Sequence, residues 1–148
     1  VTFFREVYPS AQISIRPTEG DVQVVADPDL LELALFNLVE NAAKYSKSPA
    51  KITLFFQQQK GKVEIVVQDQ GIGIPEADQE HIFERFYTVD KAHSQKMGGS
   101  GLGLSIVKTI IEKHLGSIHL TSTLGEGSTF TVQLPLPPPA LKDLQSRA

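Results

Sequence analysis

Three stretches of the 148-residue chain combine residue types that could bind a ligand. The first holds Asn37, Asn41 and Lys44, whose spacing places them on one edge of a helix. Asn carbonyl oxygens suit Mg²⁺ shared with phosphate oxygens, and a lysine adds a positive charge. Glu40, the one acid near this edge, could polarise a nucleophile. Spacing alone favours the plainer alternative, a polar helix edge in water with Glu40 as a surface carboxylate.

The second stretch is Asp69-Gln70-Gly71-Ile72-Gly73, which follows an alternating run typical of a strand. Two glycines separated by one residue allow the backbone to turn sharply and to approach a ligand closely. A carboxylate at the end of a strand can accept a hydrogen bond from an exocyclic amine, such as that of adenine. The alternative is an ordinary glycine-rich turn with a capping Asp, and the motif alone does not choose between them.

The third stretch runs from Gly98 to Leu104, directly before a predicted helix. Glycine-rich backbone at a helix N-terminus presents free N–H groups to an anion, so the stretch favours phosphate binding over a flexible hinge. It is not a P-loop, because no Gly-Lys-Ser/Thr follows. It is not a dinucleotide fingerprint either, because it lacks a preceding strand and a ribose-binding acid.

Between the second and third stretches lie Phe83 and Phe86, three residues apart. We interpret both as packing anchors rather than as a binding box. The histidines show no spacing typical of metal ligands, and His119 alternates with Ile118 and Leu120, which predicts that it faces solvent from a strand.

The elements that must position these residues follow from hydrophobic periodicity and from turn residues. Asp27 and Pro28 mark a helix start, with Asp27 as N-cap and Pro28 at the first helical position. Helices are expected at residues 28–45, 76–83 and 101–114, and strands at 13–16, 22–26, 51–57, 62–68, 117–122 and 128–134. This order predicts an α+β two-layer sandwich, in which a mixed five-stranded sheet carries about three helices on one face. Residues 1–136 would form one domain and residues 137–148 a loose tail.

Composition limits the function classes. The formal net charge is −3, with no cysteine and 41% hydrophobic residues. A mildly acidic chain without a long basic run gives no reason to expect nucleic-acid binding. No apolar run approaches the roughly 20 residues that cross a bilayer, so no membrane contact is expected. Because the chain starts at Val1 rather than Met, it is expected to be a piece of a longer protein.

Taken together and in order, these segments resemble the Bergerat-type (GHKL) ATP-binding fold, and within it the catalytic domain of two-component sensor histidine kinases. Residues 37–45 resemble the N box of that family and Asp69-Gln70-Gly71-Ile72-Gly73 its G1 box. Residues 83–86 resemble its F box and residues 99–104 its G2 box. The resemblance covers about residues 12–135.

The resemblance implies a site for ATP and Mg²⁺. Asp69 would accept from the adenine amine, while Asn41 with Asn37 would hold Mg²⁺. Asn37, Glu40 and Lys44 would form the catalytic group, with Lys44 on the phosphate chain. The other ATP-binding positions would be Asn41, Tyr45 against the base, Gly71, Gly73, Ile74, Gly99, Ser100, Gly101, Leu102, Gly103 and Leu104. Residues 88–98 would be the ATP lid, where Thr88 replaces a basic residue that many members carry; Arg85, Lys91 or Lys96 could substitute.

The implied activity is transfer of the γ-phosphate to a histidine in a preceding dimerisation domain, the first step of signalling to a response regulator. His81 is followed by Ile82 and Phe83 rather than by an acid, and the other histidines match the phosphoacceptor motif no better. The acceptor is therefore expected upstream of Val1, and this chain is expected not to phosphorylate itself. The expected location is the cytoplasm, with membrane anchoring of the parent protein left open.

Two alternatives remain. One is a hydrolytic or serine-directed relative on the same fold, such as a gyrase-, Hsp90- or MutL-type ATPase or an anti-sigma-factor kinase. The hydrolytic branch uses a Glu to activate water where this chain has Asn37, which cannot act as a base. The other is a non-catalytic nucleotide-binding or protein-interaction module, which the intact glycines and Asp69 disfavour.

Overall fold

The computed structural model describes residues 12–15, 23–46, 50–87 and 103–137. Along the chain these form the elements β1 (Gln12–Ile15), α2 (Pro28–Lys44), β2 (Lys51–Gln59), β3 (Lys62–Asp69), α3 (Glu76–Gln79), α5 (Gly103–Lys113), β4 (Ser117–Thr123) and β5 (Gly127–Pro135).

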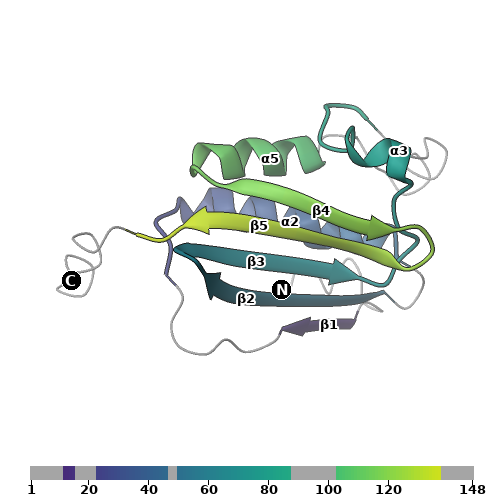
Figure 1. Ribbon diagram of the computed structural model, residues 1–148, viewed down its shortest axis with the longest axis horizontal. Coiled ribbons are helices and arrows are strands. Elements are labelled where there is room, and N and C mark those ends of the chain that lie inside the picture. Colours follow the sequence, from purple (N-terminus) through teal and green to yellow (C-terminus); the bar gives the residue numbers. More distant parts are fainter. Residues whose placement is uncertain (1–11, 16–22, 47–49, 88–102, 138–148) are drawn as a thin grey trace.

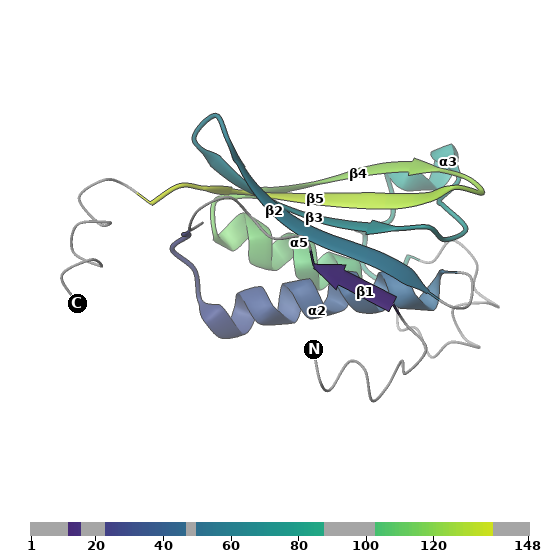
Figure 2. The same ribbon diagram turned by 90° about the horizontal axis from the view of Figure 1, so that it is seen from below.

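The strands form one five-stranded sheet in the order β1-β2-β3-β5-β4. β1 pairs with β2 in parallel, and the other neighbours are antiparallel, so the sheet is mixed as predicted. α2 and α5 lie side by side on one face, which gives the second layer (Figure 1 and Figure 2). The short α3 lies beside the edge strand β4 instead of under the sheet. The α+β two-layer prediction is confirmed.

The core lies between the sheet and the two long helices. Alternating residues of the central strands point toward it, and Phe130, Val132 and Leu38 are fully buried there. Burial of the α2 stripe is deepest at Ala34, Leu38 and Ala42, spaced at helical intervals. This packing holds the helices at a fixed height over the strand ends.

Both ends of the helical layer have specific contacts. At the start of α2, Asp27 Oδ1 accepts from the backbone N–H groups of Asp29 (3.0 Å) and Leu30 (3.2 Å), so the predicted N-cap is confirmed. At the end of α5, His114 Nε2 accepts from the Asp27 backbone N–H at 3.0 Å, while Nδ1 lies 2.8 Å from the Ile110 oxygen. The C-terminus of α5 therefore meets the N-terminus of α2, and the two helices are antiparallel.

On the opposite face of the sheet, polar side chains form a row across four strands, which we call the polar ladder. Gln57 Nε2 donates to Glu64 Oε1 at 2.7 Å, and Gln133 Nε2 donates to Glu64 Oε2 at 3.0 Å. Ser117 Oγ donates to Gln133 Oε1 at 3.3 Å. Each residue of the ladder sits directly opposite the next in the strand register, so side-chain bonds reinforce the backbone pairing.

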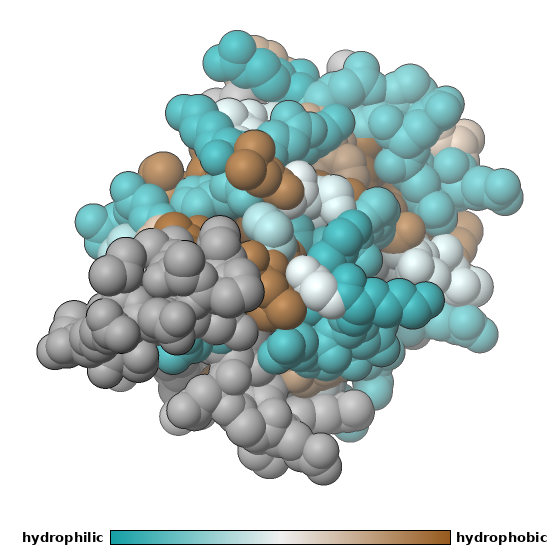
Figure 3. Space-filling model, turned by 60° about the vertical axis from the view of Figure 1, so that its left-hand side comes forward, coloured by the Kyte–Doolittle hydropathy of each residue, from teal (hydrophilic) through white to brown (hydrophobic). Residues whose placement is uncertain are grey.

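The surface is mixed rather than uniformly polar. On the face shown in Figure 3, hydrophobic side chains emerge in small groups between hydrophilic ones. The most exposed large apolar side chains among the described residues are Leu115, Phe86 and Leu124. No helix in the described part of the chain is long and apolar enough to cross a membrane.

Two local predictions were wrong. Residues 23–26 are not a strand: β1 pairs with β2 instead, and without a partner the apolar alternation of that segment leaves Val25 half-exposed on the way to α2. The expected helix at 76–83 is helical only over Glu76–Gln79, and turns follow, in which the N–H groups of His81 and Glu84 each bond to the carbonyl three residues back. The predicted ends at Arg16, Val22 and residues 101–102, and the tail at 138–148, lie outside the described residues.

The N-cap carries a stability prediction. Replacing Asp27 with Ala should lower the free energy of unfolding by about 1 kcal/mol, because two N–H groups at the start of α2 lose their acceptor. Chemical denaturation measures the difference, and Glu32→Ala on the exposed side of the same helix is the matched control. Equal stability of the Asp27 and Glu32 variants would contradict the assigned cap.

Candidate functional site

The candidate site forms where the end of α2 meets the turn after β3. The Ile72 N–H donates to the Tyr45 carbonyl at 3.1 Å, and Ser46 and Gly71 form an isolated antiparallel bridge. The Gly125 N–H of the β4–β5 turn donates to the Ile72 carbonyl at 2.7 Å. Three segments distant in the sequence therefore converge at one end of the molecule, on the right in Figure 1.

The glycines of the G1 segment are required by contact with the protein itself. A Cβ atom at Gly71 would lie 2.5 Å from the Tyr45 carbonyl oxygen. Gly73 has φ +74, and a Cβ there would lie 2.3 Å from the Thr123 oxygen. Neither backbone position admits a side chain. These glycines hold the turn between α2 and the β4–β5 hairpin, which agrees with the alternative interpretation of the motif as a glycine-rich turn capped by an Asp.

Asp69 ends β3 with its carboxylate buried against the core. Its Oδ1 accepts from the N–H groups of Gly71 (2.9 Å) and Ser128 (3.2 Å). Burial raises the pKa of the Asp69 carboxyl, and the two backbone N–H donors lower it in part. Among the described residues, no donor bonds to the second oxygen, Oδ2. One oxygen is thus fixed by the fold, and the other can accept from a ligand.

The β4–β5 hairpin contributes to the site in a way that the sequence patterns did not predict. The Ser122 hydroxyl lies 2.8 Å from Ser128 Oγ and accepts from the Ile74 N–H at 2.8 Å. Gln79 Nε2 donates to the carbonyls of Ile74 (2.9 Å) and Ser122 (3.2 Å). The hairpin therefore anchors both Asp69 and the chain that leads into α3. Gly125 and Gly127, which close the hairpin turn, were the available signal.

The helical layer brings Asn37 of α2 next to Gly103, the first residue of α5. A Cβ atom at Gly103, the first residue of α5, would lie 3.2 Å from Asn37 Oδ1. Asn37 Nδ2 donates to the Leu33 carbonyl at 2.9 Å, which orients the side chain and directs its oxygen toward Gly103. These two predicted site residues, far apart in the sequence, are therefore neighbours.

One turn further along α2 lie Asn41 and the pair formed by Glu40 and Lys44. Lys44 Nζ is 3.1 Å from Glu40 Oε1, and both side chains are partly buried. Glu40 thus pairs with Lys44, another residue of the predicted catalytic group, and its carboxylate is not a free base. The Asn41 amide is half-buried and bonds to no other described side chain, so its oxygen is available to a ligand.

Of the remaining predicted positions, the structure describes two. Ile74 lies in the site, where its N–H bonds to Ser122, and Leu104 packs partly against the core. Gly99, Ser100, Gly101 and Leu102 lie outside the described residues, as do residues 88–98 with Thr88, Lys91 and Lys96. No group of three or more His, Cys, Asp and Glu side chains in the described part of the chain is arranged to hold a metal ion.

The two phenylalanines of the F box behave differently. The Phe83 ring meets Phe130 edge-on, with ring centroids 6.2 Å apart, so its role as a packing anchor is confirmed. Phe86 is 69% exposed and has φ +65, so the same prediction for Phe86 was wrong. A three-residue spacing places two side chains on one face only within a helix, and α3 ends at Gln79, before both phenylalanines. The chain therefore turns Phe86 outward.

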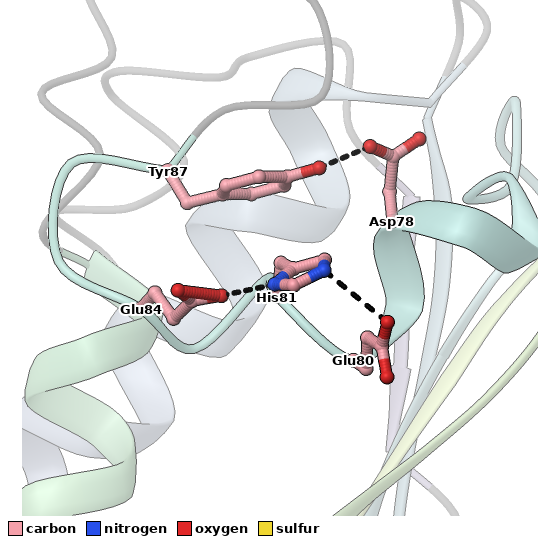
Figure 4. A network of polar contacts seen from close by, with 5 residues as sticks. All are labelled: Asp78, Glu80, His81, Glu84 and Tyr87. Atoms are coloured by element: carbon pink, nitrogen blue, oxygen red, sulfur yellow. Dashed lines mark hydrogen bonds and ion pairs between the residues drawn. The ribbon is translucent and has the colours of Figure 1, made fainter.

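A polar network surrounds His81 in the same segment (Figure 4). His81 Nδ1 bonds to Glu84 and Nε2 lies 3.2 Å from Glu80 Oε1, so both ring nitrogens face a carboxylate. The His81 ring also lies 5.4 Å from the Tyr87 ring, whose hydroxyl donates to Asp78. The hydrogen bond to Glu84 is the main reason why the pKa of His81 is raised above 6.5. His119 is exposed on β4, as predicted.

Comparison with known proteins gives a consistent result. The family model for histidine kinase-, DNA gyrase B- and HSP90-like ATPases matches residues 26–138. The sensor-like histidine kinase SenX3 of Mycolicibacterium smegmatis is 47% identical over 129 residues, covering 85% of this chain and 33% of that protein. The chain thus spans about a third of the length of this relative.

Solved structures agree with this match. The mycobacterial sensor histidine kinase MprB has a TM-score of 0.78 at 30% identity, covering 93% of this chain and 89% of that chain. Full-length ShkA in complex with AMPPNP has a TM-score of 0.74 at 25% identity, covering 89% of this chain and 28% of that one.

The His81 network carries a pH prediction. Because the pKa of His81 is higher in the folded chain, its pairs stabilise the fold below about pH 6.5 and are lost as pH rises through the raised value. Replacing His81 with Gln should therefore lower the melting temperature most at about pH 6, with the difference shrinking toward about pH 9. The same substitution at the exposed His119 is the control. A difference that does not change with pH would show that the pairs do not form.

Proposed function

Because the chain belongs to the family of histidine kinase-, DNA gyrase B- and HSP90-like ATPases, as the catalytic ATP-binding domain of a sensor histidine kinase, we propose that it binds Mg-ATP and presents the γ-phosphate to a histidine of another domain. The observation that carries the proposal is the Asp69 carboxylate. It is buried, it is fixed through Oδ1 by two backbone N–H groups, and Oδ2 remains as an acceptor. A buried, half-satisfied carboxylate at a strand end suits the exocyclic amine of adenine.

The base-binding residues would lie around this acceptor. Tyr45 would lie against the base from the end of α2, where its carbonyl already holds the G1 turn. Gly71, Gly73 and Ile74 would line the opposite side, because the turn that contains them is locked to α2 and to the hairpin. The AMPPNP complex of ShkA, a relative with the same fold, supports binding of an adenine nucleotide.

The phosphates would lie between the two long helices. Gly103, with Gly99, Ser100, Gly101 and Leu102 before it, would offer backbone N–H groups at the start of α5, beside Leu104. Lys44 would offset negative charge on the phosphate chain.

The donor set fits Mg²⁺ only in part. Asn41 has an uncommitted amide oxygen and Asn37 directs its oxygen toward Gly103, so both are neutral oxygen ligands that Mg²⁺ accepts alongside phosphate oxygens. The described residues supply no cluster of three ionisable ligands, so the ion would be bound together with the nucleotide rather than by the protein alone. Bound there, Mg²⁺ would neutralise charge on the transferring phosphate.

Phosphoryl transfer would need mainly positioning from this chain. The nucleophile would be an imidazole of the dimerisation domain of the parent protein, and the phosphate would pass on to a response regulator. Glu40 would act through its pair with Lys44 by holding that side chain in place. A hydrolytic function is less well supported, because Asn37 stands where a water-activating Glu is needed and its amide is bonded to the Leu33 carbonyl.

Nucleotide binding should appear as stabilisation. Mg-ADP at about 100 times its dissociation constant should stabilise the wild-type chain by about 2.7 kcal/mol, measured as a shift in thermal unfolding. Absence of any shift would favour a protein-interaction module instead.

Replacing Asp69 with Asn should weaken Mg-ADP binding at least about tenfold, because Oδ2 is replaced by a donor that opposes the adenine amine.

The unliganded Asp69→Asn variant should not be less stable than wild type. The pKa of Asp69 is raised by burial, so its ionised form destabilises the fold as pH rises through that raised value, whereas a neutral amide avoids this cost. Denaturation without nucleotide measures this, with Glu126→Gln in the exposed hairpin turn as control. A large loss of stability would show that Asp69 serves mainly to hold the fold.

The chain should not phosphorylate itself. Incubated with ATP labelled on the γ-phosphate, it should acquire no acid-labile label, because none of its histidines is followed by an acidic residue. Full-length SenX3 from Mycolicibacterium smegmatis, assayed in parallel, is the positive control. Label on any histidine of this chain would refute a separate acceptor domain.

A further inference from the structure

A row of polar residues continues the core at the site end of the sheet. Ser122 on β4 pairs with Ser128 on β5, and Gln68 on β3 pairs with Thr129, which places Asp69 opposite Ser128. Residues opposite one another in antiparallel strands point to the same face of the sheet. The adjacent buried pair, Val67 and Phe130, faces the helices. Ser122, Ser128 and Asp69 therefore point toward the helical layer, at the edge of the candidate site.

The hydrogen bonds of Ser122 determine where its single hydroxyl proton lies. Its Oγ is 3.0 Å from the Gly127 carbonyl, which can only accept, so the Ser122 proton points there. The Ile74 N–H donates to the same oxygen at 2.8 Å. Ser128 Oγ lies 2.8 Å from Ser122 Oγ, and because the Ser122 proton is used, the bond between them uses the Ser128 proton.

The Ser128 hydroxyl is thereby fixed as an acceptor toward its surroundings. Its proton is directed to Ser122, and its backbone N–H is directed to Asp69 Oδ1. What remains on Ser128 Oγ is lone pairs. Asp69 is joined to Ser128 through Oδ1, and its other oxygen, Oδ2, also offers only lone pairs when the carboxylate is ionised. Two acceptors on residues joined by a hydrogen bond, Asp69 and Ser128, favour a ligand group that carries two hydrogens.

We propose that Ser122 is a positioning residue that orients the Ser128 hydroxyl and so makes this edge of the site selective for the 6-amino group of a purine over a 6-oxo group. One hydrogen of the amine meets Asp69 Oδ2 and the other meets Ser128 Oγ. A 6-oxo group places its own lone pairs against both acceptors. The inference rests on the proposed nucleotide site, and it assigns the selectivity to a residue that need not touch the ligand.

The test compares ADP with IDP, in which a 6-oxo group replaces the 6-amino group, by calorimetric titration with Mg²⁺. The wild-type chain should bind ADP at least about tenfold more tightly than IDP. In Ser122→Ala the Ser128 proton is released and can turn toward the ligand, so IDP should gain affinity and the ADP/IDP ratio should fall by about tenfold. Ser122→Thr keeps the hydroxyl and should keep the ratio. Thr121→Ala, exposed next to it on β4, is the control.

The outcomes separate the two proposals. If the wild-type chain binds neither nucleotide, the proposed function fails. If it binds ADP but Ser122→Ala weakens both nucleotides in proportion, nucleotide binding stands and the inference is overturned, because a merely structural residue would act that way. Should Ser122→Ala not fold, Ser128→Ala decides: it should weaken ADP several-fold without weakening IDP, because the removed hydroxyl accepts from the 6-amino group and opposes the 6-oxo group. An equal loss for both nucleotides overturns the inference.

Discussion

The structure is arranged around a carboxylate that is held out of water. Burying Asp69 opposes its ionisation, and the fold compensates with two backbone N–H groups at one oxygen. Those donors come from a turn after β3 and from the start of β5, so both must approach Asp69 closely. The approach leaves no room for a side chain at Gly127, where a Cβ atom would lie 2.2 Å from the Asp69 carbonyl oxygen. The glycines of this region therefore follow from the need to place donors around one acceptor.

The helical layer obeys a second constraint, which is axial register. α2 and α5 are antiparallel. At one end His114 bonds to the Asp27 N–H, and toward the other end Gly103 lies next to Asn37. Ten residues separate Asp27 from Asn37 and eleven separate Gly103 from His114, which correspond to about 15 and 16 Å of helix. The two spans match, so one contact supports the other. The start of α5 is thereby held beside the polar edge of α2.

Sequence patterns predicted the parts of this arrangement that depend on local chemistry. Asp27 and Pro28 identified the start of α2, and alternation identified the four long strands. Asp69 and Gly103 were recognised as candidates because glycines next to a carboxylate or a helix start have few local explanations. The family resemblance then supplied the roles, which no single motif could.

The parts that could not be predicted depend on long-range contacts. The pairing of β1 with β2 in parallel, and the absence of a strand at residues 23–26, are decided by which edge is free. Ser122 and Ser128 look like ordinary strand residues until the register places them beside Asp69. Phe86 was expected to pack, but its positive φ turns it outward. In each case the deciding neighbour lies elsewhere in the chain or in a turn that periodicity does not reveal.

The polar ladder on the other face of the sheet bears on how the chain avoids misfolding. A slip of one residue between β3 and β5 would turn the Val63, Ile65 and Val67 face away from the helices. It would also separate the nearly buried Glu64 carboxylate from its two amide donors. Errors of pairing are thus penalised on both surfaces at once. The native strand register buries the apolar face of β3 and also pairs the Glu64 carboxylate with its amide donors. The same register builds the site.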